Sequence, residues 1–148
     1  MRIHNTIHDS IVDGPGLRYV VFTQGCPHHC PGCHNPETHD PAGGQETPVE
    51  DLIQDMLRNP LLDGLTLSGG EPFLQPEDCA ALARAAHDAD LNVWCYTGWT
   101  LEQLRERPEA EVLLREIDVL VDGAYMEEQR TFNLPWRGSA NQRIHELR

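Results

Sequence analysis

The chain has 148 residues, a length that suits one domain, and we expect residues 1–148 to form a single domain. Acidic side chains outnumber basic ones by 24 to 11, and a formal charge of -13 would repel a phosphate backbone, so we expect no nucleic acid partner. All 11 basic residues are arginines, which excludes a lysine-dependent phosphate loop and a Schiff-base lysine.

The N-terminal stretch MRIHNTIHDS lacks the apolar core of a signal peptide, and no uncharged apolar run reaches the roughly 20 residues of a membrane span. We therefore expect a cytoplasmic protein without a membrane partner. In a reducing compartment, 5 cysteines are more typical of metal ligands or catalytic groups than of disulfides.

The first predicted strand leads directly into a cysteine-rich loop. β-Branched and aromatic residues predict the strand over Leu17–Thr23. A helix is predicted after Thr47, with Thr47 and Glu50 forming a capping box. The Asn-Pro pair at 59–60 ends this helix, because the residue before a proline disfavours helical geometry.

The chain then alternates between strand and helix patterns. Three further strands are predicted, at GLTLSGG (64–70), LNVWCYTG (91–98) and IDVLVDG (117–123). One intervening helix covers Pro76–Ala89, and a second begins with a capping box of Thr100 and Gln103. The tail beyond residue 123 has weak periodicity and predicts no regular element.

Strands alternating with helices imply parallel pairing and right-handed crossovers, hence an α/β domain built as a doubly wound sheet or as part of a barrel. Four such units cannot close an eight-stranded barrel. In either architecture the loops at the carboxyl ends of the strands share one edge, where ligands bind. We expect four loops to meet there: GCPHHCPGCHNPE (25–37), SGGEP (68–72), YTGW (96–99) and DGAY (122–125).

Cys26, Cys30 and Cys33 have the spacing C-x3-C-x2-C, which is open to three interpretations. A buried helical stripe conflicts with the prolines between them. A structural zinc ion would need a fourth ligand such as His34 or His28, and the usual second ligand pair is missing. A four-iron cluster fits better, because three thiolates would leave one iron open to a substrate.

This cysteine spacing after the first strand resembles the signature of the radical S-adenosylmethionine (SAM) enzymes. The resemblance implies an incomplete, TIM-like β/α barrel with mostly parallel strands. It also implies that Cys26, Cys30 and Cys33 are the catalytic centre, holding a [4Fe-4S] cluster whose open iron binds SAM. An electron from the reduced cluster would release methionine and a 5'-deoxyadenosyl radical.

The stretch SGGEP resembles the GGE motif of the same enzymes, and the resemblance implies that SAM is bound by Ser68, Gly69, Gly70 and Glu71. Glycines let the backbone approach a ligand, and Glu71 offers an acceptor for the SAM ammonium group. Taken alone, the same residues are equally consistent with a turn into the next helix.

One position departs from the family pattern. Many members carry an aromatic residue before the third cysteine, where this chain has Gly32. We therefore expect Tyr96 or Trp94 to pack against adenine, although either aromatic also suits the core of a strand. Cys79 and Cys95 lie within a helix and a strand, so we expect both to be buried and neither to be a ligand.

The segment VDGPGLR at 12–18 resembles the activases of glycyl radical enzymes, although it also suits a tight turn. With LTLSGGEP, VWCYTGWTLEQL, IDVLVDG and LPWRGSANQR, the resemblance covers roughly residues 11–148. It implies that Asp13, Gly14 and Gly16 meet the partner, and that Arg137 pairs with an acidic group on the partner or on SAM.

The function implied is that of an oxidoreductase that creates a glycyl radical on a large partner enzyme. Anaerobic ribonucleoside-triphosphate reductase is the partner expected first, and pyruvate formate-lyase is the alternative. A flavodoxin or ferredoxin is the expected electron donor. A non-enzymatic zinc or iron-sulfur binding module is the remaining interpretation.

Overall fold

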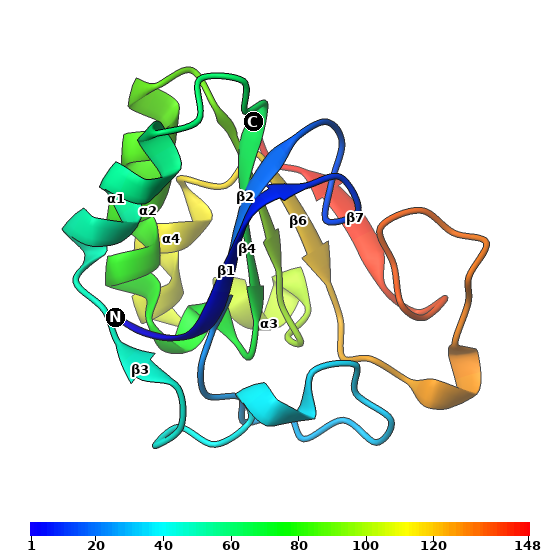
Figure 1. The fold of residues 1–148 in the computed structure, drawn as a ribbon. Coiled ribbons are helices and arrows are strands. Elements are labelled where there is room, and N and C mark those ends of the chain that lie inside the picture. Colours follow the sequence, from blue (N-terminus) through cyan, green and yellow to red (C-terminus); the bar gives the residue numbers. More distant parts are fainter.

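A seven-stranded mixed sheet runs through the computed structural model, which describes all residues 1–148 (Figure 1). Its strands are β1 (Arg2–Ser10), β2 (Arg18–Thr23), β3 (Gln45–Glu46), β4 (Gly64–Gly69), β5 (Asn92–Tyr96), β6 (Val119–Asp122) and β7 (Arg143–Glu146). The helices are α1 (Val49–Leu57), α2 (Pro76–Asp88), α3 (Leu101–Arg105) and α4 (Glu111–Leu114). None of these helices combines the length and apolarity that crossing a membrane requires.

The strand order is β3-β1-β2-β4-β5-β6-β7. The centre is parallel, since β2 pairs with β4, β4 with β5, and β5 with β6 in the same direction. Both flanks are antiparallel, because β1 pairs in the opposite direction with β2 and β3, and β7 does so with β6.

The predicted incomplete barrel with mostly parallel strands is therefore wrong. The sheet is open, and antiparallel strands from the two ends of the chain extend it on either side. The family resemblance implied the barrel, and the strand patterns did not correct it, because β1 and β7 are rich in polar residues and give no strand pattern. β1 exposes much of its length, and β7 has no buried residue.

The two faces of the sheet differ in chemistry. Leu65 and Leu67 of β4 belong to the main hydrophobic core, together with apolar residues of α1, α2 and α4. The alternate residues Thr66 and Ser68 point to the other face, because successive side chains of a strand alternate. Figure 1 shows α1, α2 and α4 on one side of the sheet, which leaves the opposite side for loops and the tail.

One of the two predicted capping boxes is present and the other is absent. Thr100 and Gln103 form the expected capping box at α3. The capping box expected at Thr47 is absent, because α1 begins at Val49 with Pro48 as its N-cap and no side-chain hydrogen bond. The Thr47 backbone instead exchanges two 2.8 Å hydrogen bonds with Met1, which tie this segment to the N-terminus.

Candidate functional site

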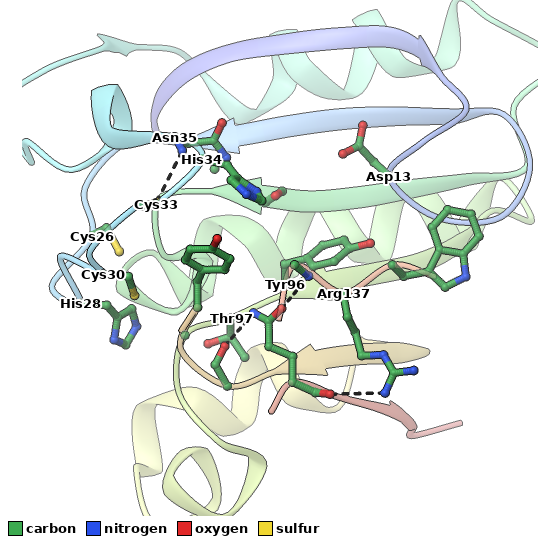
Figure 2. Close-up of a pocket in the computed structure, with 18 of the residues that line it drawn as sticks. Asp13, Cys26, His28, Cys30, Cys33, His34, Asn35, Tyr96, Thr97 and Arg137 are labelled. Atoms are coloured by element: carbon green, nitrogen blue, oxygen red, sulfur yellow. Dashed lines mark hydrogen bonds between the residues drawn. The ribbon is translucent and has the colours of Figure 1, made fainter. Parts of the chain in front are cut away.

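A cavity of about 950 Å³ opens at the carboxyl ends of the parallel strands (Figure 2). Its lining comes from all four loops that were expected to meet there: Cys26, Cys30 and Cys33; Ser68, Gly69 and Gly70; Tyr96, Thr97 and Gly98; Gly123 and Tyr125. Parallel connectivity alone explains this convergence, since it places these loops at one edge of the sheet.

The cysteine loop is held by backbone hydrogen bonds rather than by a helix. The N–H of Gly25 donates to Thr38 at 2.7 Å, and the N–H of Cys26 donates to His39 at 3.1 Å. A turn brings the N–H of Cys33 to the carbonyl of Cys30 at 3.1 Å. The helical stripe that the prolines already argued against is thereby excluded, and all three cysteines are free and partly exposed.

Without a metal, the local environment favours protonated thiols at two of these positions. Burial raises the pKa of Cys26, against a smaller lowering by the N–H of His28. Burial likewise raises the pKa of Cys30, against the N–H of Tyr125. Cys79 and Cys95 are fully buried among apolar residues, as expected for core positions.

The donor set fits an iron-sulfur cluster better than a single metal ion. No three His, Cys, Asp or Glu side chains converge on a point that could hold one ion. Thiolates of a cluster bind separate irons and need not converge in this way. The histidines considered for zinc have other contacts, since His28 bonds Glu71 at 2.7 Å and the ring of His34 lies 4.8 Å from that of Tyr125.

The glycines of SGGEP bring the end of β4 onto the cysteine loop. The N–H of Gly70 donates to Thr23 at 2.9 Å, and the N–H of Glu71 donates to Gly25 at 2.8 Å. A Cβ atom on Gly70 would lie 2.4 Å from the carbonyl oxygen of Gly25, so no larger residue fits there. The two motifs found in the sequence are thus in direct backbone contact.

Four of the five predicted SAM-binding residues, Ser68, Gly69, Gly70 and Tyr96, line the cavity. Glu71 is not among the lining residues and is fully buried behind them. Burial raises the pKa of Tyr96, so that its phenol stays protonated.

The aromatic residues of the cavity come from different segments. Tyr96, Tyr125 and Trp136 line it, whereas Trp94 is buried and packs edge-on against Trp136 at 5.7 Å. Gly32 has a structural explanation, because its φ of 72° lies in the left-handed region that favours glycine.

Sequence reasoning identified only part of what the tail contributes: it named Arg137 within LPWRGSANQR but assigned no role to Trp136 or Gln142. Residues between Thr131 and Gln142 line the cavity although their sequence has no periodicity. The side chain of Gln142 shapes this segment, since it accepts from the N–H of Gly138 at 2.8 Å and donates to the carbonyl of Gly123 at 2.9 Å. Such irregular bonding leaves no pattern to detect.

Arg137 is the only arginine that lines the cavity. Its Nε is buried without a hydrogen-bond partner, and its Nη1 donates to Gln142 only at a long 3.5 Å. No carboxylate of the chain pairs with it, and Asp13, the one carboxylate in the lining, bonds Ser10 instead. Figure 2 shows Arg137 on the same side of the cavity as Tyr96, away from the cysteines.

Comparison with known proteins places this chain among iron-sulfur proteins. A family model described as a 4Fe-4S single cluster domain matches residues 12–145. The anaerobic ribonucleoside-triphosphate reductase-activating protein of Vibrio cholerae is 38% identical over 156 aligned positions, which cover 99% of each chain. Its counterpart in Escherichia coli K12 is 36% identical over 159 positions and 100% of each chain. That of Enterobacteria phage T4 is 34% identical over 90% of this chain and 86% of its own.

Proposed function

The chain belongs to the family of anaerobic ribonucleoside-triphosphate reductase-activating proteins, and from this premise we propose that it cleaves SAM reductively to create a glycyl radical on such a reductase. One observation carries the proposal. Three free cysteines share a single cavity with the SGGEP loop and with aromatic side chains suited to a nucleoside.

Cys26, Cys30 and Cys33 would hold the cluster. When bound and reduced, a [4Fe-4S] cluster with one iron free of protein ligands supplies the electron that breaks the C5'–S bond of SAM, giving methionine and a 5'-deoxyadenosyl radical. The protein contributes a fixed loop and a hydrogen bond to sulfur, since the N–H of Asn35 donates to Cys33 Sγ at 3.5 Å. Hydrogen bonds of this kind tune cluster potentials.

The remaining lining residues suit the rest of SAM. Tyr96 offers an aromatic ring for adenine, and Tyr125 and Trp136 supply further aromatic surface. Arg137 offers a positive charge for the carboxylate of SAM. No other arginine lines the cavity, so no other could pair with this carboxylate. The volume of about 950 Å³ lies at the upper end of the range for small-molecule pockets, which suits SAM with a short segment of the partner beside it.

The protein substrate must bring a backbone glycine to the same cavity. A glycine has no side chain to obstruct its approach, and abstraction of its Cα hydrogen would complete the formation of 5'-deoxyadenosine. The cysteine loop carries exposed Pro27 and Pro31, so an electron donor such as flavodoxin or ferredoxin can approach the cluster closely from outside.

Anaerobic reconstitution with iron and sulfide, followed by reduction in the presence of SAM, tests this function. We expect 5'-deoxyadenosine from the native protein, none from Cys26→Ala, Cys30→Ala or Cys33→Ala, and normal amounts from Cys79→Ala, which alters a buried core cysteine. Equal activity in all four variants would refute the ligand assignment, and a colourless protein with one bound zinc would refute the function.

The partner is identified by a second measurement. The reduced protein and SAM are mixed separately with an anaerobic ribonucleoside-triphosphate reductase and with pyruvate formate-lyase. We expect the electron paramagnetic resonance signal of a glycyl radical only on the reductase. A signal on pyruvate formate-lyase alone would contradict the proposed partner.

A further inference from the structure

Glu71 is a fully buried carboxylate whose hydrogen-bonding capacity is already filled. The N–H of Phe73 donates to Oε2 at 3.1 Å, and the N–H of Gly98 donates to Oε1 at 2.8 Å. The hydroxyl of Thr97 lies 2.9 Å from each oxygen, and Nε2 of His28 lies 2.7 Å from Oε1. A carboxylate offers about four lone-pair positions, so these donors leave none for a ligand.

The donors to Glu71 come from three separate segments. His28 belongs to the cysteine loop after β2, Phe73 to the turn after β4, and Thr97 and Gly98 to the loop after β5. Because β2, β4 and β5 are neighbours in the sheet, one carboxylate cross-links the ends of three adjacent strands. A charge buried this deeply is stable only when it is bonded in this way.

The loop after β5 is shaped to receive the ring of His28. A Cβ atom on Gly98 would lie 2.3 Å from Cδ2 of His28, so the ring occupies space that only glycine leaves open. The ring of Trp99 packs edge-on against it at 4.7 Å, and the His28 side chain is 13% exposed. The adjacent His29, by contrast, is exposed.

We propose that Glu71 is a positioning residue that fixes the cysteine loop, through His28, against the loops that bind SAM. Figure 2 shows His28 beside Cys26 and Cys30, and its anchoring limits where these two sulfurs lie. The proposal rests on the proposed function, because it takes this loop as the cluster site. It replaces the role that the sequence resemblance implied for Glu71, acceptance of the SAM ammonium group.

Hydrogen–deuterium exchange on the anaerobically reconstituted full chain tests the anchoring. In His28→Ala we expect the amides of residues 25–39 to exchange about tenfold faster, the effect of losing one hydrogen bond to a charged group, with the amides of β4 and β5 unchanged. His28→Gln keeps an Nε2–H donor of similar reach and should restore most of the protection. His29→Asn, in the same loop, is the matched control: His29 is exposed, its φ of 48° suits asparagine, and its ring only touches His39 edge-on at 5.2 Å, so exchange should stay close to that of the native protein.

SAM affinity separates the two roles of Glu71. If Glu71 positions the loop, His28→Ala raises the Kd of SAM and changes the electron paramagnetic resonance spectrum of the reduced cluster, while His28→Gln stays close to the native protein. Native loop exchange in His28→Ala, with SAM affinity lost only in Glu71→Gln, would overturn the proposal. The exchange comparison needs neither SAM nor turnover. If the native protein failed to cleave SAM, the proposed function would be refuted, but the exchange rates would still test whether Glu71 anchors the loop.

Discussion

Arg137 gives the first prediction at the scale of single residues. It is the only arginine in the lining, and its Nε is buried without a partner, so its interaction with a bound carboxylate would not compete with an internal ion pair. Arg137→Gln should raise the Kd of SAM about 10- to 100-fold, since a hydrogen bond to a charged group contributes about 1.5–3 kcal/mol. Equilibrium dialysis with the reconstituted protein measures this change.

The control for Arg137 is Arg130, which lies on the same tail and stacks on Phe132 at 4.6 Å. Arg130→Gln should leave the Kd of SAM unchanged, because this side chain does not line the cavity. Equal Kd values for Arg137→Gln and the native protein would show that the SAM carboxylate is met elsewhere.

Arg18 explains why the VDGPGLR segment has its shape. The side chain is fully buried, and burial lowers its pKa to about 10, which still leaves it charged at neutral pH. It donates to the hydroxyl of Thr66 at 2.7 Å, to the side chain of Asn92 at 2.7 Å and to the carbonyl of Pro15 at 2.9 Å. One residue thus ties the loop before β2 to β4 and β5.

Removing Arg18 should therefore destabilise the whole fold. Arg18→Met leaves several buried acceptors without donors, and we expect a loss of about 3–5 kcal/mol in the free energy of unfolding. Arg84 on α2 is exposed, so Arg84→Met should change it by less than about 0.5 kcal/mol. Urea denaturation of both variants measures the difference, and similar midpoints would refute the role of Arg18.

At the scale of elements, Asp122 connects β6, α3 and β7. It ends β6, accepts from the N–H of Leu101 at the start of α3 at 2.7 Å, and accepts from Nη2 of Arg143 on β7 at 2.7 Å. Burial raises the pKa of Asp122, but the hydrogen bonds from Arg143 and Leu101 outweigh it and hold the pKa below 3.8. The antiparallel edge of the sheet thus depends on an ionised carboxylate.

The sign of this pKa shift sets a pH dependence. A lowered pKa in the folded state means that ionised Asp122 adds stability above the unfolded-state value of 3.8, and that this stability is lost as pH falls toward the folded-state value. Asp122→Asn should cost about 2 kcal/mol at pH 7, and the difference from the native protein should shrink below pH 4. Urea denaturation at pH 7 and pH 3 measures it, and a constant difference would contradict this account.

Elements built from local patterns could be predicted from the sequence, and those built from edge pairing could not. Leu17–Thr23 and Pro76–Ala89 carry clear periodicities, and they correspond to β2 and α2. β1 and β7 are edge elements with polar sequences, and pairing with neighbours that are distant in the chain determines them. Without these two strands, the sequence pattern remained compatible with the barrel that the family resemblance implied.

The same distinction between local patterns and long-range contacts applies to the candidate site. The cysteine loop and SGGEP carry recognisable motifs. The iron-sulfur activase family that these motifs indicated is confirmed by the family model and the relatives. The cysteine ligands and SAM-binding residues themselves remain predictions. Gln142 and Trp136 lie within the quoted LPWRGSANQR pattern but were assigned no role, because they line the cavity through irregular loops that only the folded structure brings there.

At the scale of the whole molecule, the two faces of the sheet serve different purposes. Helices α1, α2 and α4 cover one face and bury the main core. The other face bears the cavity, whose margins carry Val12 at 74% exposure and Phe132 at 82%. Ile11, beside Val12, is 72% exposed. Apolar side chains from two distant segments thus border the cavity to which we propose that the partner brings its glycine.

Phe132 therefore tests how the partner docks. Phe132→Ser should raise the Kd of the complex with the reductase about tenfold, since truncating a well-placed interface aromatic costs about 1–2 kcal/mol, and should lower the yield of glycyl radical. Cleavage of SAM without the partner should not change, because the cysteines and Ser68–Gly70 are untouched.

Leu61 provides the matched control for Phe132. It is 75% exposed but does not line the cavity, so Leu61→Ser removes a comparable exposed apolar side chain from a different part of the surface. The Kd of the complex, measured anaerobically by isothermal titration calorimetry, should stay at the native value in Leu61→Ser. Equal Kd values for the two variants would mean that the side chain of Phe132 does not contribute to binding of the reductase.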